Sequence, residues 1–369
     1  MKDFYSFDEL SIPYMIRVLF WGLYLVVFAY AVWKMVVSTT KNKKLTEVTG
    51  LFVIFFALYA VFYCINPDYF RYRDWIYNRD FDLWNKEGIY ISIVYLCRTL
   101  SVSYPYEVFR LIIWGGAVII AYYTFRMYRG LLLPGLAVLL LFVFHAGTFC
   151  YARASLAMAI YFFGIAIFLL HDRKILKLLG IGLALSSLFF HREMLIGIAI
   201  LPCLFIPFER KKFTILSAIF LLLAVLAISF FSSNLEFLDQ MFDNEDISSK
   251  MEIYDEKGQG EFRLSTLINY LKYFFPFYLI TKYFWKNKIP NSVVGMYRIS
   301  YGILMASIAF MLVYGLRSIY TYRIMYISMI PMTALIGYGY SRGYFTKKQF
   351  LLMMLIALLT NSVRFVNAQ

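Results

Sequence analysis

Long apolar runs separated by short polar connections form the main pattern along the chain. A helix that crosses a hydrocarbon core about 30 Å thick needs about 20 residues, and about twelve runs approach that length. The pattern predicts an all-α, polytopic membrane protein with about 12 transmembrane helices in one integral membrane domain, residues 1–369. The predicted spans are Met15–Val37, Leu51–Asn66, Glu107–Phe125, Leu131–Phe149, Ala152–Leu170, Ile175–Phe190, Met194–Phe208, Phe213–Phe231, Leu264–Trp285, Val293–Gly315, Arg323–Tyr340 and Phe350–Val363.

Two connections are much longer than the others. The first, residues 67–106, is dense in charged and aromatic residues and contains an apolar segment, Ile89–Leu100, that is too short to cross the membrane. We expect this segment to form a re-entrant or interfacial helix. The second, residues 232–263, carries nine carboxylates against three basic residues. Loops of this length and charge favour chemistry or recognition on the side of the membrane where they lie.

The composition supports the membrane assignment. Hydrophobic residues make up 62% of the 369 residues and charged residues 16%, whereas soluble domains have about 45–50% and roughly 25%. A soluble enzyme is therefore excluded. The formal net charge is +14. The basic residues lie in short clusters between apolar runs, and clusters of this kind set the membrane topology and attract anionic lipid headgroups. We therefore expect no nucleic-acid partner.

The basic clusters occupy every second connection and predict the orientation. By the positive-inside rule these connections face the cytoplasm, and only Glu47, Asp172 and Glu209 among the 22 acidic residues fall on that side. Both termini and the two long loops are then predicted to lie outside. The clusters are Lys41, Lys43 and Lys44; Arg126 and Arg129; Arg173, Lys174 and Lys177; Arg210, Lys211 and Lys212; Lys282, Lys286 and Lys288; and Arg342, Lys347 and Lys348.

Several ionisable residues fall within or next to the predicted spans. An arginine at mid-bilayer costs roughly 2.5–3.5 kcal/mol on insertion scales, so such residues are candidates for function. We expect them to concentrate near the outer ends of the spans and to line a shared cavity open to the outer side. The candidates are Arg153, His191, Arg192, Arg298, Arg317 and Arg323, and the first outer loop adds the carboxylates Asp68 and Glu87.

A membrane cavity with several arginines favours a phosphate ligand, because guanidinium groups bind phosphate oxygens in a bidentate manner and do not deprotonate. A lipid pyrophosphate is the anionic ligand of this kind that a membrane supplies. Arg153 is also predicted to lie at a helix N-terminus, where the helix dipole favours anions. The alternative is that some of these arginines reach the outer headgroups. The three histidines are far apart in sequence, and we expect no metal and no other cofactor.

Three stretches resemble the EpsG branch of the Wzy-type polysaccharide polymerases. The first is NPDYFRYRDWIYN followed by KEGIYISIVYL, similar to a family pattern of Asp, spaced Tyr residues and Glu-x-Gly-aromatic. The second is FCYARASLAMAIYFFGIAIFLL followed by LALSSLFFHREMLI, similar to an Arg-x-x-x-Ala helix and a helix that ends in Phe-His. The third is YTYRIMYISMIPM, similar to a late Arg-x-x-x-Tyr element. The resemblance covers about Asn66 to Pro331, and Ala154 stands where many members have Gln.

This resemblance implies a membrane glycosyltransferase of GT-C-like architecture in the bacterial cytoplasmic membrane, with its active site on the outer face. Its substrates would be donor and acceptor oligosaccharides linked to undecaprenyl diphosphate, without a nucleotide sugar or a metal, and a chain-length regulator is a further candidate partner. The product would be O-antigen, capsule or exopolysaccharide. The resemblance also implies Arg153 and Arg323 as phosphate ligands, His191 near the reaction centre, and Asp68 and Glu87 on the outer loop.

Two other functions remain open from the sequence. A flippase for lipid-linked oligosaccharides would also need an arginine-lined cavity, although its charges should reach both leaflets. Another GT-C transferase that uses lipid-linked sugars would carry an acidic pair in the first outer loop, and Asp80 with Asp82 resembles such a pair. An acyltransferase would require a cytoplasmic histidine, and His171 is the only one predicted on that side.

Overall fold

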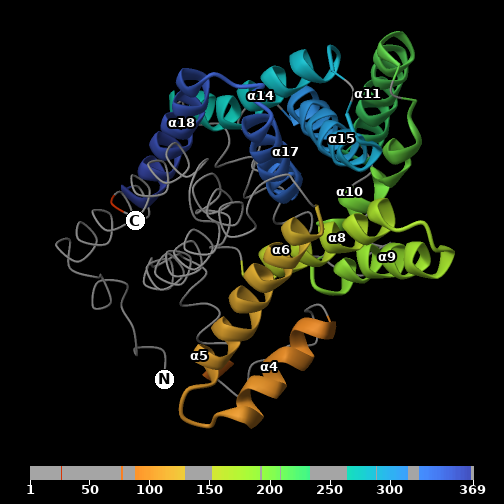
Figure 1. Ribbon diagram of the computed structural model, residues 1–369. Coiled ribbons are helices and arrows are strands. Elements are labelled where there is room, and N and C mark those ends of the chain that lie inside the picture. Colours follow the sequence, from red (N-terminus) through yellow and green to blue (C-terminus); the bar gives the residue numbers. More distant parts are fainter. Residues whose placement is uncertain are drawn as a thin grey trace.

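The computed structural model describes residues 26, 76–77, 88–128, 152–191, 193–207, 209–232, 264–287, 289–314 and 324–366. Within these ranges all regular structure is helical, which agrees with the predicted all-α class. Figure 1 shows α4 beside the helix formed by α5 and α6, α8 beside α9, and the remaining helices grouped around α15 and α17. The helices are α4 (Gly88–Leu100), α5 (Pro105–Arg110), η1 (Leu111–Gly115), α6 (Gly116–Met127), α8 (Ala152–Leu170), α9 (Lys174–Ser186), η2 (Ser187–Phe189), α10 (Met194–Ala199), η3 (Leu201–Phe205), α11 (Arg210–Ser232), α14 (Leu264–Phe284), α15 (Asn291–Tyr314), α17 (Met329–Ser341) and α18 (Lys347–Val366).

Three helical segments of the described ranges are long and apolar enough to cross a membrane. They are Pro105–Met127, Arg210–Phe230 and Asn291–Val313, each at the site of a predicted span. Helix α8 also has the predicted bounds of its run. The predicted spans Met15–Val37, Leu51–Asn66 and Leu131–Phe149 lie outside the described residues except for Val26, which is helical. The structure therefore supports a helical membrane protein, while the number of spans stays a prediction.

The run Met194–Phe208 is not one continuous helix. It forms two short pieces, α10 and η3, that meet at Ile200. Pro202 lies in the first turn of η3 and has no N–H to donate. The N–H of Cys203 bonds the carbonyl of Ile200 at 2.8 Å, which is the tighter spacing of a 3₁₀ turn. The apolar run therefore bends here, and its length alone did not predict the bend.

Helices α8 and α9 pack backbone against backbone. A Cβ atom added to Gly164 would stand 2.5 Å from the carbonyl oxygen of Gly180, and one added to Gly180 would stand 2.6 Å from the carbonyl oxygen of Gly164. Only residues without a side chain allow helices to approach this closely. The two glycines therefore fix the crossing point of the pair, and α6 also packs against α8.

An aromatic cluster joins α11, α14 and α15. The rings of Phe277 and Tyr297 stack with centroids 5.0 Å apart, and Phe213 of α11 lies 5.9 Å from Tyr297. The Tyr297 hydroxyl lies 2.9 Å from the hydroxyl of Thr281 on α14. Ring contacts of this kind add about 0.5–1.5 kcal/mol each beyond their burial. The cluster holds the start of α15 firmly against its neighbours.

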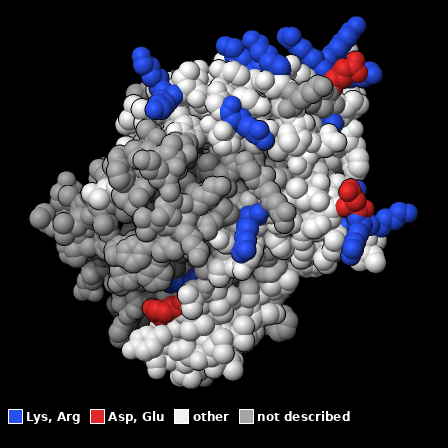
Figure 2. Space-filling view, in the orientation of Figure 1, with Lys and Arg blue, Asp and Glu red and all other residues white. Residues whose placement is uncertain are grey.

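Charged side chains gather on limited parts of the surface. Figure 2 shows Lys and Arg along the upper and right-hand margins of one face, while most of the described surface between them carries no charge. Helix α11 faces outward over most of its length, because only 11% of its most apolar window is buried and leucines such as Leu222 and Leu223 are exposed. An apolar exposed helix with basic residues at its start is typical of contact with lipid.

Candidate functional site

The first candidate site lies at the end of the α8–α9 pair where α8 begins. Arg153 is the second residue of α8, so it lies at a helix N-terminus as predicted. It precedes Gly164 by eleven residues, and His191 follows Gly180 by eleven. Because the helices run antiparallel and cross at these glycines, the start of α8 and the end of α9 lie in the same direction from the crossing, and η2 (Ser187–Phe189) leads from the end of α9 to His191. The structure thus brings Arg153 and His191 to one end of the pair.

His191 is held by the residue two positions further along the chain. The backbone N–H of Glu193 donates to Nδ1 of His191 at 3.2 Å, and Nε2 lies 4.0 Å from Oε2 of Glu193. A neutral imidazole has one donor and one acceptor nitrogen. Since Nδ1 accepts a hydrogen bond, the geometry implies that Nε2 carries the proton. In this arrangement Nδ1 is occupied as an acceptor, and Nε2 lies near the Glu193 carboxylate.

Arg298 lies nearer to the start of α15 than to its end. It follows Asn291, the first residue of α15, by seven residues, so it lies about 10 Å from that end of the helix. The start of α15 is the end that joins the basic connections, and the prediction had placed Arg298 at the opposite, outer end. Its Nη1 donates to the backbone carbonyl of Leu204 in η3 at 2.7 Å. This bond satisfies a carbonyl at the end of a 3₁₀ turn, so the guanidinium has a structural partner.

The other predicted site residues lie outside the described residues. This set comprises Asp68, Glu87, Arg192, Arg317 and Arg323, and the side chain of Arg153 is likewise not described. Two described residues of the first long loop do show where that loop is attached. Nε of Arg98 donates to the carbonyl of Ile76 at 2.9 Å, and the Tyr77 hydroxyl donates to Glu107 at 3.2 Å. The loop is therefore tied to α4 and to the start of α5.

A buried lysine was missed by the sequence reasoning. Lys272 lies within α14, and 3% of its surface is exposed. Its ammonium nitrogen lies 5.1 Å from the ring centroid of Tyr273, which is within the range of a cation–π contact. Its position in the middle of an apolar run is the sequence signal that could have identified it, since ionisable residues in such runs are functional candidates by default.

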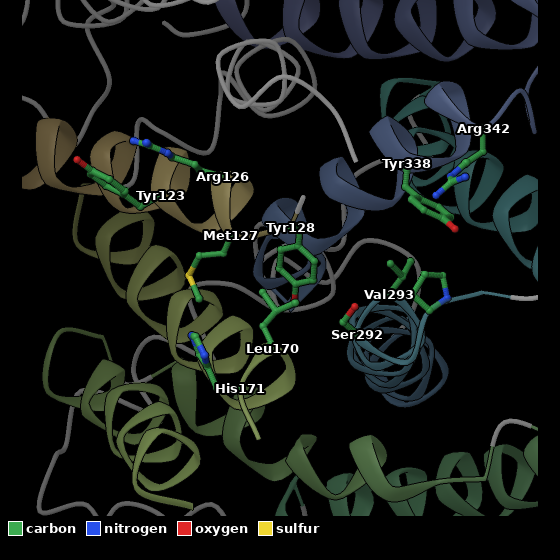
Figure 3. A pocket seen from close by; sticks show the side chains of 11 residues that line it. Tyr123, Arg126, Met127, Tyr128, Leu170, His171, Ser292, Val293, Tyr338 and Arg342 are labelled. Atoms are coloured by element: carbon green, nitrogen blue, oxygen red, sulfur yellow. The ribbon is translucent and has the colours of Figure 1, made fainter. Parts of the chain in front are cut away.

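A pocket of about 680 Å³ opens among the ends of four helices. Arg126 comes from the end of α6, His171 follows the end of α8, Ser292 lies in the first turn of α15, and Arg342 follows α17. Figure 3 shows Tyr128 between the α6–α8 side and the α15–α17 side of this pocket. Each of the four positions belongs to or adjoins a connection predicted to be cytoplasmic. The pocket therefore lies at the end of α8 opposite to Arg153.

The topology derived from the basic connections thus receives structural support. Arg126 and Arg342 come from connections more than 200 residues apart in the sequence, and yet they line one pocket together with residues that adjoin two other predicted cytoplasmic connections. Helix ends that lie on the same face of the membrane can line one pocket in this way, even when they are far apart in the sequence. Which side of the membrane this face adjoins stays a prediction from the positive-inside rule.

Comparison with known proteins identifies the family. The model of the EpsG family matches residues 47–368, which is nearly the whole chain. The chain belongs to the EpsG family. No curated protein and no solved structure matches it.

Membership confirms the resemblance carried by the three motifs, and the matched region extends beyond it at both ends. As an EpsG-family member, the chain has a general role as a polysaccharide polymerase, with glycosyltransferase-type chemistry and lipid-linked saccharide substrates. Its apolar helices agree with a place in a membrane.

Proposed function

We propose that this EpsG-family chain joins oligosaccharide repeat units linked to undecaprenyl diphosphate, at the outer face of the cytoplasmic membrane. The observation that carries the proposal is the antiparallel register of α8 and α9, which puts Arg153 and His191 at the same end of one helix pair. The GT-C-like architecture and the count of about twelve spans belong to the same proposal. So does the second phosphate ligand, Arg323.

The reaction is a displacement at the anomeric carbon of the donor. A hydroxyl oxygen of the acceptor sugar forms the new bond to this carbon, and the bond between the carbon and the pyrophosphate oxygen breaks. The lipid diphosphate leaves with the electron pair. Negative charge grows on the leaving pyrophosphate, and arginines fixed in advance beside it stabilise that charge without a metal. Arg153 is suited to this role by its place at the N-terminus of α8.

The acceptor hydroxyl must lose a proton. We assign this step to a carboxylate of the first outer loop, Asp68 or Glu87, and not to His191. Nδ1 of His191 already accepts the N–H of Glu193, and Nε2 lies 4.0 Å from Oε2 of the same residue, so both nitrogens face Glu193 and we assign His191 a positioning role. His191 then orients an oxygen of the substrate, and general-base help from the carboxylate contributes about 10²–10⁴-fold.

Arg298 is outside the proposed set of phosphate ligands. Its guanidinium donates to the Leu204 carbonyl near the opposite end of the spans. Counted along their helices, Arg298 and Arg153 differ by about 15 Å in depth along the membrane normal. Arg192 and Arg317 remain proposed ligands on the outer side, because their places in the sequence adjoin His191 and Arg323.

Reconstitution tests the proposal. The purified chain in nanodiscs, supplied with a synthetic undecaprenyl-diphosphate oligosaccharide and no nucleotide sugar, should produce a ladder of products that differ by one repeat unit. Arg153→Ala should abolish the long products without changing membrane insertion. Arg173→Ala is the matched control, since it removes the same charge from the exposed opposite end of the same helix pair. Long products of normal length from Arg153→Ala would disprove the phosphate role.

A ladder that requires a nucleotide sugar would disprove the donor assignment. Saturable binding of the lipid with no ladder from the native repeat unit would instead support a flippase. The two results are separable, because the flippase moves intact lipid-linked units from one leaflet of a vesicle to the other and leaves their length unchanged.

A further inference from the structure

The pocket between the ends of α6, α8, α15 and α17 lies at the opposite end of α8 from the proposed site, and the proposed function does not use it. We propose that this pocket binds a phosphate ester that approaches from the basic face of the protein. Two sources share this chemistry, the headgroup of an anionic lipid and a soluble phosphorylated molecule.

The described residues that line the pocket give it a positive charge. Arg126 and Arg342 line the pocket from different helices, and His171 lines it as well. Among the described residues that line the pocket there is no Asp or Glu. Two guanidinium groups that line one pocket without a carboxylate give it a positive potential that favours an anion. Because guanidinium groups bind phosphate oxygens in a bidentate manner, a phosphate suits the pair well.

One of these arginines already has a fixed position. The guanidinium carbon of Arg342 lies 5.6 Å from the ring centroid of Tyr338, and this ring is itself buried. A cation held over an aromatic face loses less conformational freedom when a ligand arrives. Arg126 is exposed, so it can close on the ligand from the other side.

A buried tyrosine hydroxyl provides evidence for a ligand that is independent of the arginines. Tyr128 is 3% exposed, it lines the pocket, and its hydroxyl has no hydrogen-bond partner among the residues that the structure describes. In Figure 3 its ring stands in the middle of the group of labelled side chains. Burial raises the pKa of Tyr128, so the hydroxyl keeps its proton and can donate it to an anion. A buried hydroxyl without a partner is costly, and a ligand oxygen would remove that cost.

The first turn of α15 adds a further source of positive potential. Ser292, the second residue of this 24-residue helix, lines the pocket beside Val293. The N–H groups at the start of a helix point away from the helix body and carry about half a positive charge. The N–H groups of Val293 and Val294 bond the Pro290 carbonyl, so the contribution of this turn is the helix dipole together with the Ser292 hydroxyl.

The size of the pocket indicates what accompanies the phosphate. A volume of about 680 Å³ is typical of sites for small organic molecules and much larger than one phosphate requires. Tyr123, Met127 and Leu170 supply an uncharged wall. The ligand is therefore a phosphate attached to an uncharged organic group, such as the glycerol part of a phospholipid or the sugar part of a soluble ester.

Hydrogen–deuterium exchange of the full chain in nanodiscs tests this site locally. In neutral phosphatidylcholine nanodiscs, inorganic pyrophosphate should slow exchange at residues 290–294 and 124–128. In a parallel sample without pyrophosphate, phosphatidylglycerol is added to the nanodisc. Protection by pyrophosphate identifies a soluble phosphate ester as a ligand, and protection by phosphatidylglycerol identifies a lipid headgroup; either result supports the site.

Variants connect the protection to the pocket. Arg126→Gln with Arg342→Gln should weaken binding at least tenfold, whereas Arg173→Gln with Lys174→Gln, the same charge change on exposed residues outside the pocket, should leave it unchanged. Tyr128→Phe removes only one hydroxyl and should raise about tenfold the concentration of pyrophosphate or phosphatidylglycerol that gives half of the full protection. No protection from either probe, or equal protection in the Arg126→Gln and Arg342→Gln variant, would overturn the proposal.

Discussion

The two ends of α8 differ in the charges that surround them. At its start lies Arg153, and the same end of the helix pair carries His191, whose Nε2 lies 4.0 Å from the carboxylate of Glu193. At its end, the pocket has two arginines and a histidine, and no carboxylate among its described lining residues. A mixed set of charges suits a reaction in which protons and hydroxyl groups must be handled. A purely cationic set suits the retention of an anion, so the two ends are equipped for different tasks.

The ends are also too far apart to share a ligand. Eighteen residues separate Arg153 from His171, which corresponds to about 27 Å along a helix. This is close to the thickness of a hydrocarbon core. A ligand at one end can affect the other only through the helices between them, and the contact of Gly164 with Gly180 lies between the two ends.

The largest expected effect comes from that contact. Gly164→Val places side-chain atoms against the backbone of α9, which cannot move aside as a flexible side chain could. We expect a loss of several kcal/mol of stability and damage at both ends of the pair, measured as a loss of monodisperse protein in size-exclusion chromatography.

Gly182→Ala is the matched control, because a Cβ at Gly182 meets nothing within 4 Å. Alanine has the better helix propensity by about 1 kcal/mol, so this variant should be at least as stable as the wild type. A Gly164→Val protein that behaves like Gly182→Ala would show that the helices do not cross at Gly164.

A second prediction concerns the start of α8 only. His191→Asn retains a side-chain acceptor for the Glu193 N–H but removes Nε2, so the chain should fold normally while polymer output falls by at least about tenfold. A donor that aligns the substrate, as proposed, should give the same pH profile in the residual activity. If His191 were instead the general base, the acidic limb of that profile would change.

A third prediction separates structural from ligand-binding arginines. Arg298→Ala should destabilise the chain by about 1–3 kcal/mol, because it leaves the buried Leu204 carbonyl without its donor. The change is measured as a lower midpoint of thermal unfolding in detergent. An unchanged midpoint with complete loss of polymer would show that Arg298 belongs to the phosphate site after all.

The smallest effect is expected at the other end of α8. Tyr128→Phe should leave the stability of the ligand-free chain unchanged or raise it by up to about 1 kcal/mol, because it removes a buried hydroxyl that is costly without a partner. Its hydroxyl has no partner among the described residues, so no hydrogen bond is lost. A marked fall in the midpoint would reveal a partner for this hydroxyl and would weaken the case for a ligand in the pocket.

The sequence predicted helices well where the length of an apolar run was sufficient. Ala152–Leu170 is a helix with those bounds, and three predicted spans coincide with long apolar helices. The sequence was less informative where one residue alters a run, as Pro202 does between α10 and η3. It did not reveal the partner of Arg298 either, since an arginine in an apolar run does not show which carbonyl it bonds.

The sequence by itself determined the class of the protein, its family and the side on which its basic connections gather, because hydrophobicity, charge and short motifs act locally along the chain. Only the tertiary structure decided which residues meet. Neither the glycine contact that aligns Arg153 with His191 nor the pocket shared by Arg126 and Arg342 has a signal in the local sequence. Both depend on how helices pack, and packing is set by the shapes of surfaces that lie far apart in the chain.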